Sequence, residues 1–249
     1  MSIKVSGELY LNEVKLEGLN SPTDQFKDDV VYDVGSDYSP VLDKIDKLVL
    51  VDTAGTERDY TTPTATLDYG NARVTLTGTV TASASYTCNR VRAYSGTKCY
   101  FEYTLSPSVS ISSGVTYRVT YIITLSISLT SSSPPANLDP TYTELHKMIA
   151  DTLATGSKIH DITSSVSLRL YMGETLVASK TGCTLSYDQN ANTATITFSW
   201  TQETTITFDR FRVYFSDGTY DYYYLAAIFT SSQTITGGTP VTFTITVSL

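Results

Sequence analysis

Residues 119–129 read VTYIITLSISL, and this stretch decides the fold class. Apolar side chains occupy every odd-numbered position from Val119 to Leu129, while Thr and Ser occupy most of the even-numbered ones. Successive side chains of a strand point to opposite faces, so the pattern predicts a long strand with one dry face and one hydroxyl-covered face. Thr suits such a strand because it is β-branched and still wettable.

The same alternation recurs at residues 74–80, 193–200 and 241–248, and each of these runs also predicts a strand. The chain of 249 residues contains 41 Thr and 29 Ser, while only 17% of its residues are charged. Hydroxyls therefore cover much of the surface that charge would normally cover. A hydrophobic fraction of 41% supplies an ample core and excludes an intrinsically disordered protein.

Two halves of the chain repeat each other. Residues 66–71 (TLDYGN) match residues 184–189 (TLSYDQ), and residues 89–94 (NRVRAY) match residues 209–214 (DRFRVY). Glycine-containing turns follow in the same order, Gly96-Thr97 with Gly218-Thr219 and Ser113-Gly114 with Gly237-Gly238. The repeat predicts two copies of one sandwich-like unit, each with about seven short strands.

We therefore predict an all-β protein with two tandem, duplicated β-sandwich domains of jelly-roll type. The expected divisions are an acidic N-terminal arm at 1–40, a first sandwich at 41–130, a linker with one short helix at 131–161, and a second sandwich at 162–249. The arm should hold one or two extra strands without a counterpart in the second copy. Its residues 21–37 predict a short helix or a loop.

One helix is expected just before the second sandwich, from about Pro140 to Ala154. Asp139 can cap it, proline is favoured at a first helical position, and Gly156 can end it. Four apolar side chains fall near one face of this helix: Leu145, Met148, Ile149 and Leu153. We expect the helix to lie across the entrance of the second sandwich.

Charge is concentrated at the N-terminus. Residues 1–60 contain 13 acidic and 6 basic residues by count, so most of the net charge of -8 belongs to them. The nearly neutral remainder lacks the repulsion that keeps soluble proteins apart, and it suits packing against copies of the same chain. Nucleic-acid binding depends on a basic surface, so we expect no direct binding of nucleic acid.

The sequence predicts no enzyme: no catalytic residue, cofactor site or metal site stands out. His146 and His160 have no acidic or Cys partner at ligand spacing, and the acidic run at 24–37 lacks the order of a calcium loop. Three cysteines show no metal-binding spacing and are expected to be buried free thiols: Cys88, Cys99 and Cys183.

Two groups of residues are candidates for an interface. The first is the pair of equivalent arginine strands, with Arg90, Arg92, Arg210 and Arg212. These guanidiniums could pair with the acidic arm of an adjacent subunit, or they could be ordinary solvent-facing arginines. The second is a run of tyrosines that cannot all point inward from one strand, and that could stack on a sugar or on a neighbouring subunit: Tyr220, Tyr222, Tyr223 and Tyr224.

The Arg-x-Arg-x-Tyr blocks, the Gly-Thr turns and the long final strand of the first copy resemble virion structural proteins of tailed phages and of viruses of thermophilic archaea, including jelly-roll capsid and turret proteins. The resemblance covers residues 45–130 and 162–249. It implies a non-enzymatic protein that self-assembles into a capsid, a turret or vertex, or a tail. Its implied partners are copies of itself, other virion proteins, and a host-surface glycan or receptor.

We expect residues 1–40 to reach onto an adjacent subunit, because the extra strands and the acidic charge are concentrated there. The N-terminus lacks the apolar core of a secretory signal, and no stretch is apolar enough to span a bilayer. A virion protein made in the host cytoplasm, without membrane insertion, fits these features. Two alternatives stay open: an extracellular archaeal filament subunit that completes its neighbour's sheet with an N-terminal strand, and a carbohydrate- or receptor-binding β-sandwich module.

Overall fold

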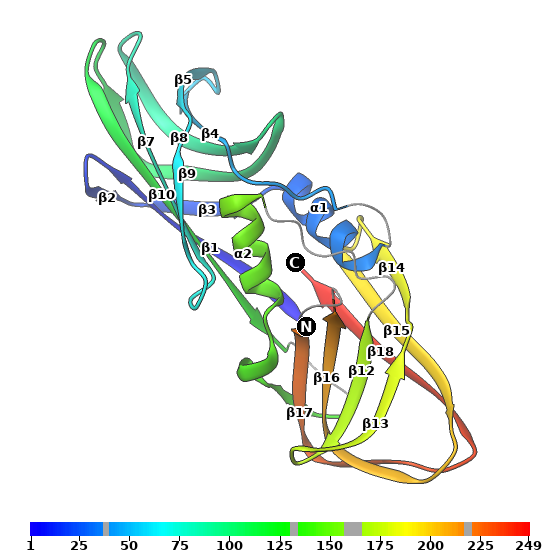
Figure 1. The fold of residues 1–249 in the computed structure, drawn as a ribbon. Coiled ribbons are helices and arrows are strands. Elements are labelled where there is room, and N and C mark those ends of the chain that lie inside the picture. The colour runs from blue at the N-terminus through cyan, green and yellow to red at the C-terminus, as the bar shows by residue number, and fades with distance from the viewer. Residues whose placement is uncertain (37–39, 130–133, 157–165, 217–220) are drawn as a thin grey trace.

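The computed structural model describes residues 1–36, 40–129, 134–156, 166–216 and 221–249. It confirms an all-β fold of two tandem sandwich-like units. The molecule is elongated, with the first unit at one end, the second unit at the other, and two helices between them (Figure 1).

Seven strands of the first unit correspond one to one with seven of the second. Those of the first unit are β4 (Lys47–Asp52), β5 (Glu57–Thr61), β6 (Thr64–Asp68), β7 (Arg73–Thr81), β8 (Tyr86–Ser95), β9 (Lys98–Ile111) and β10 (Thr116–Ser128). Their counterparts are β12 (Ser167–Met172), β13 (Thr175–Thr181), β14 (Thr184–Asp188), β15 (Thr193–Gln202), β16 (Ile206–Ser216), β17 (Asp221–Ile235) and β18 (Thr239–Ser248).

Strand register shows that the duplication extends to irregularities of the backbone. Strand β8 shifts register against β9 after Cys88 and after Ala93, and β16 shifts against β17 at the equivalent Phe208 and Val213. A bulge is a specific local geometry that packing must favour, so its repetition at matching residues is a strong sign of common descent of the two units.

The strands form three sheets. Two outer sheets have the orders β3-β9-β8-β4-β5 and β11-β17-β16-β12-β13, while a large shared sheet has the order β14-β15-β18-β1-β10-β7-β6. The remaining strands are β1 (Ser2–Leu11), β2 (Val14–Leu16), which pairs with β1, β3 (Gly18–Pro22) and β11 (Ala136–Leu138). Since β3 and β11 pair with the equivalent strands β9 and β17, only β1 and β2 lack a counterpart among the described strands.

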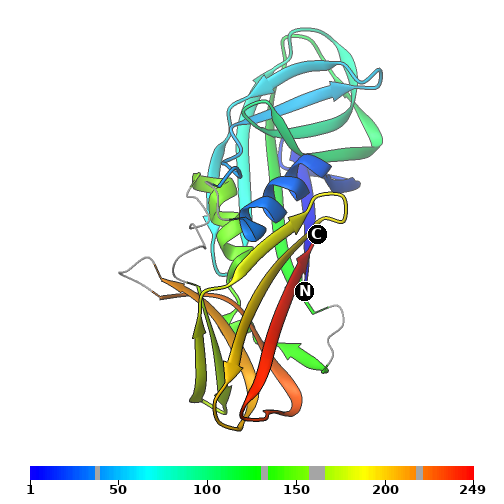
Figure 2. The same ribbon diagram turned by 90° about the vertical axis from the view of Figure 1, so that its right-hand side faces the viewer.

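Strand β1 joins the two units. It pairs antiparallel with β10 along its whole length, from Ser2 opposite Ser128 to Leu11 opposite Val119, and meets β18 at a single pair, Ser2 with Ser248. The two ends of the chain consequently lie side by side near the middle of the molecule (Figure 2). The sequence led us to expect this segment on a neighbouring subunit; in the structure it is packed into its own chain.

The helix before the second unit is shorter than expected. Residues Pro140–Tyr142 form a 3-10 turn, η1, which Asp139 caps by accepting a hydrogen bond from the Thr141 amide, and α2 spans Leu145–Thr155. Thr143 interrupts the two because its hydroxyl is held between the carbonyls of Asp139 and Ala226. Gly156 ends α2 in a left-handed conformation with φ of 80°, as predicted.

The two helices lie between the units and pack on them differently. Helix α1 (Asp24–Gly35) packs on β9 of the first unit and equally on β14 and β15 of the second, whereas α2 packs mainly on β6, β7 and β10 of the first. The expectation that α2 covers the second sandwich is therefore wrong. The apolar face of α2 is buried against the first unit, where its end is also tied by a hydrogen bond from the Ile45 amide to the Leu153 carbonyl.

The repeated tyrosines of the sequence mark these contacts. The ring centres of Tyr32 on α1 and Tyr187 are 5.2 Å apart, and Nζ of Lys147 on α2 lies 5.9 Å from the ring centre of Tyr69. Helix α1 thus bridges both units while α2 packs on the first, and the two units share one continuous hydrophobic core.

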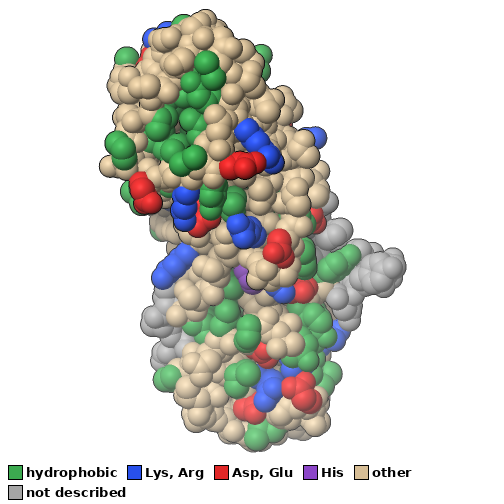
Figure 3. All heavy atoms as spheres, turned by 90° about the vertical axis from the view of Figure 1, so that its left-hand side faces the viewer, with side chains coloured by type: hydrophobic (Ala, Val, Ile, Leu, Met, Phe, Trp, Pro, Cys, Tyr) green, Lys and Arg blue, Asp and Glu red, His purple; other side chains and the backbone are tan. Residues whose placement is uncertain are grey.

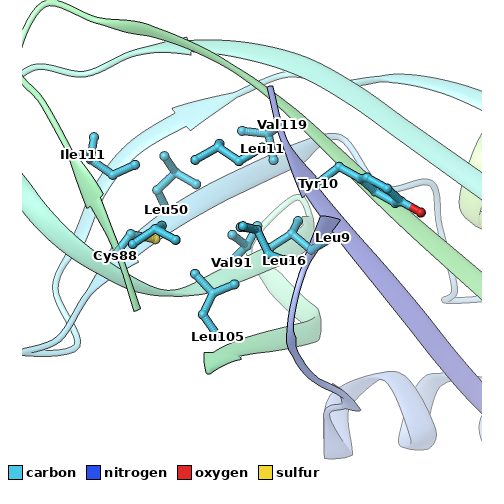
Figure 4. A pocket seen from close by; sticks show the side chains of 11 residues that line it. Leu9, Tyr10, Leu11, Leu16, Leu50, Cys88, Val91, Leu105, Ile111 and Val119 are labelled. Carbon is cyan, nitrogen blue, oxygen red and sulfur yellow. The ribbon is translucent and has the colours of Figure 1, made fainter. Parts of the chain in front are cut away.

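Side chains from β1 and β2 fill the first sandwich. Leu9, Leu11 and Leu16 project between the two sheets toward a wall that includes Val91 and Leu105 (Figure 4). The cavity left among them has a volume of about 10 Å³, no more than one water molecule needs. The first sandwich is therefore a packed core rather than a ligand pocket.

Candidate interface

The arginines predicted as interface residues form an ion-pair cluster on the first outer sheet. Arg92 donates from Nε to Glu102 Oε2 at 2.8 Å and from Nη1 to Glu57 Oε1 at 3.3 Å. Tyr94 donates its hydroxyl hydrogen to the same Glu57 oxygen, and this hydrogen bond is the main reason that the pKa of Glu57 lies below its ordinary value. Arg90 Nη1 lies 3.8 Å from Glu102 Oε2. We call these residues the Arg92 cluster.

The equivalent position in the second unit is more deeply buried. Arg212 donates to Glu174 at 2.7 Å, and its guanidinium lies 3.5 Å from the centre of the Tyr142 ring and 4.4 Å from that of Tyr171. Such cation–π stacking is favourable where the cation is removed from water. Arg210 pairs with the other oxygen of Glu174 at 2.6 Å. We call this set, with Tyr214 and Tyr223, the Arg212 cluster.

Of the predicted tyrosines, those that the structure describes contribute unequally. Tyr223 lies with its ring centre 4.6 Å from those of both Tyr142 and Tyr214, so it belongs to the Arg212 cluster. Tyr224 points into the core and is 1% exposed, while Tyr222 is half-buried against the core. Tyr220 lies outside the described residues. These rings are partners of buried side chains, and they do not form an exposed stacking platform.

Sequence reasoning found the arginines but missed the residues that bury them. Tyr142 and Tyr171 come from η1 and β12, and no local pattern connects them with β16. The two clusters differ because Tyr142 and Tyr171 stack on Arg212, whereas Val51 takes the place of Tyr171 in the first unit. As a result the side chain of Arg92 is 24% exposed and that of Arg212 is 5% exposed.

Carboxylates of the acidic arm are also engaged within the chain. Asp29 on α1 is buried and accepts hydrogen bonds from Lys98 and Tyr100, each at 2.8 Å. Asp33 accepts the backbone amides of Val41 and Leu42. The sequence suggested that this arm could pair with the arginines of an adjacent subunit. In the structure the arm forms a helix whose inner acids are held by their own chain.

Reactive chemistry is sparse in the described part of the chain. Within it, no three His, Cys, Asp or Glu side chains gather as metal ligands. His146 is half-buried on α2, where burial lowers its pKa, and His160 lies outside the described residues. The three cysteines are free; burial raises the pKa of Cys99 and that of Cys183 to about 11, which keeps both as unreactive thiols.

Neither α1 nor α2 is long and apolar enough to cross a bilayer, and these are the α-helices of the described residues. No protein-family model, curated protein or solved structure matches this chain. Its function must therefore be argued from its own geometry.

Proposed function

We propose that this chain is a non-enzymatic structural subunit that assembles with copies of itself into a virion, as a capsid, turret, vertex or tail component. The observation that carries the proposal is the exposure of apolar side chains on strands that end the two outer sheets. Leu19 on β3 and Tyr60 on β5 are each 69% exposed, and Leu176 on β13 is 49% exposed.

An edge strand with an exposed apolar side chain offers two attractions at once. Its unpaired backbone groups can extend a sheet, and the side chain can be buried by whatever strand is added. Single exposed apolar residues are common on proteins, so the argument rests on their position at sheet edges. The resemblance to virion proteins supports the choice of assembly.

The character of the surface favours the same conclusion. Charged side chains are scattered over the face seen in Figure 3, and hydrophobic side chains gather over the first unit at its upper end. Weak repulsion between copies lowers the cost of bringing them together. The two helices and β1 hold the two units together, as a building block of fixed shape would require.

The test is the size of the purified protein, followed by electron microscopy. We expect large regular particles or filaments, and we expect Leu19→Asp and Leu176→Asp to reduce their formation. Val115→Asp is the matched control, because Val115 is 43% exposed in the β9–β10 turn instead of on an edge strand. A stable monomer at high concentration would contradict the proposal.

A filament subunit remains the second candidate, because one specific feature favours strand complementation. Among the residues that the structure describes, nothing pairs with most of the free edge of β18, whereas the edge of its counterpart β10 is covered by β1. Regular filaments in place of closed particles would select this candidate.

A further inference from the structure

Within the described part of the chain, the second sandwich lacks the strand that closes the first. In the first unit β1 pairs with β10 over ten residues, whereas in the second unit β18 meets β1 at one residue pair. The chain between β10 and β11 consists of residues 129–135, which are too few to supply a strand as long as β1. The second copy of the sandwich therefore has no closing strand of its own among the described strands.

An open groove marks the position of the absent strand. It has a volume of about 390 Å³ and lies between β18 and strands β16 and β17. Three of its wall residues, Phe211, Phe229 and Phe243, are the counterparts of Val91, Leu105 and Val119. Those three line the cavity of about 10 Å³ that the leucines of β1 and β2 leave in the first unit.

The contrast between the two sites is thus one of occupancy. The second unit has larger side chains on the wall, with Phe211 5.0 Å from Phe243 and 6.0 Å from Phe229 between ring centres. These rings partly replace the leucines of β1, yet the groove stays open. Burial of further apolar area there would stabilise a complex.

Backbone groups on the groove side of β18 are directed outward. The amino group of Met1 donates to the Thr246 carbonyl, and the Ser248 amide donates to the Met1 carbonyl, so these two residues face away from β15. The pairing of β18 with β15 has no register shift, so alternation gives the N–H and C=O groups of Thr242 and Thr244 the same direction. The backbone groups of Thr242 and Thr244 can therefore form hydrogen bonds with an added strand.

We propose that the groove beside β18 binds an extended segment of another polypeptide, which pairs antiparallel with β18 and inserts uncharged, apolar side chains at alternate positions. The antiparallel direction follows from β1, which is antiparallel to the equivalent β10. No side chain described as lining the groove is charged, and the one charge there, the Met1 ammonium, is held by the Thr246 carbonyl, so the lining favours uncharged side chains in the groove. Because β1 of any further copy is packed into its own first sandwich, the segment belongs to a different polypeptide. The inference rests on the proposed assembly function and names a contact of the assembled chain with such a partner.

A peptide with the sequence of residues 2–11 is the probe, since it is the segment that fills the equivalent site. Trp200, the one tryptophan of the chain, pairs with Val241 on β18 and should report binding by fluorescence. Hydrogen exchange of the full chain should slow at residues 239–246 on adding peptide, and stay unchanged in β10. Slowed exchange in β10 instead would mean that the peptide displaces β1, and would overturn the proposal.

Thr244→Pro removes one outward amide, and Thr244→Val is its matched control. Losing a hydrogen bond of the ladder should weaken peptide binding by up to about tenfold in Thr244→Pro, with little change in Thr244→Val. Equal binding by both variants would contradict the proposal. Hydrogen exchange of the wild-type chain provides the same test should the proline variant fail to fold.

Two further outcomes separate this inference from the proposed function. A protein that stays monomeric yet binds the peptide at β18 would support the groove and contradict self-assembly. Alternatively, residues 239–246 could be protected from hydrogen exchange without peptide, in an oligomer that Thr244→Pro dissociates. Such a result would show that a second copy covers the edge of β18. That result would overturn the proposal that a segment of a different polypeptide binds beside β18.

Discussion

Replacing Leu9 with Ala should lower the free energy of unfolding by about 3–4 kcal/mol. Leu9 is 1% exposed and projects from β1 into the first sandwich, beside a cavity of about 10 Å³. The truncation removes three methyl or methylene groups, worth about 0.8 kcal/mol each on transfer from water. The enlarged cavity adds to this cost because the paired sheets around it cannot collapse, which places the total well within the range of about 2–5 kcal/mol seen for such changes.

Urea unfolding of the wild-type chain and the variant would measure this loss, with the slope of free energy against urea unchanged. The thermal midpoint should fall by about 2–4 °C for each kcal/mol. Leu19→Ala is the matched control, since Leu19 is 69% exposed in the same N-terminal segment and should cost less than about 0.5 kcal/mol. An equally small effect for Leu9→Ala would refute the reasoning, because β1 would then lie outside the sandwich of its own chain.

Three further outcomes follow from single side chains. Asp29→Asn should lower the free energy of unfolding in urea by about 2 kcal/mol, because hydrogen bonds to a buried charged group contribute about 1.5–3 kcal/mol. Asp24→Asn, which changes an exposed carboxylate of the same helix, should leave that free energy nearly unchanged. Equal losses in the two variants would contradict the buried network around Asp29. The pKa of Glu57 is lowered in the folded state, so its contribution to folding stability is complete above its ordinary pKa of 4.5 and is lost as the pH falls through the lower folded value. In Glu57→Gln the thermal midpoint should therefore fall less steeply over that pH range. A variant whose midpoint falls in parallel with that of the wild type would contradict a stabilising role of the Arg92 cluster. Burial raises the pKa of Cys99 and of Cys183 to about 11, so a thiol reagent at pH 8 should label the native protein slowly. In denaturant the same reagent should label all three thiols quickly. Fast labelling of the native protein would exclude this burial.

Local sequence pattern predicted most of the strands. The alternating runs at 74–80 and 193–200 fall within β7 and β15, and their apolar faces are buried. This succeeded because period two on a half-buried sheet leaves a direct trace in the sequence. The helix expected from Pro140 starts later, at Leu145, because Asp139 caps only the 3-10 turn η1 and the Thr143 hydroxyl then bonds to the Ala226 carbonyl in β17.

Candidate interface residues were harder to predict. The repeated arginines were visible as a motif, but their depth depends on Tyr142 and Tyr171, which reach Arg212 from other elements. Sequence spacing carries no record of such contacts, since they arise from the packing of η1 and β12 around β16. The groove beside β18 was equally invisible, because it is defined by a strand that one unit has and the other lacks.

The sequence by itself determined the all-β class, the duplication and the dry faces of the strands, because each is written in residues that are close along the chain. Only the tertiary structure decided that α1 bridges the two units while α2 packs on the first, that β1 belongs to the first sandwich, and that β18 keeps an open edge among the described residues. These are pairings between distant segments with similar local patterns. Which apolar face meets which is settled by the total area buried and the hydrogen bonds completed over the whole chain.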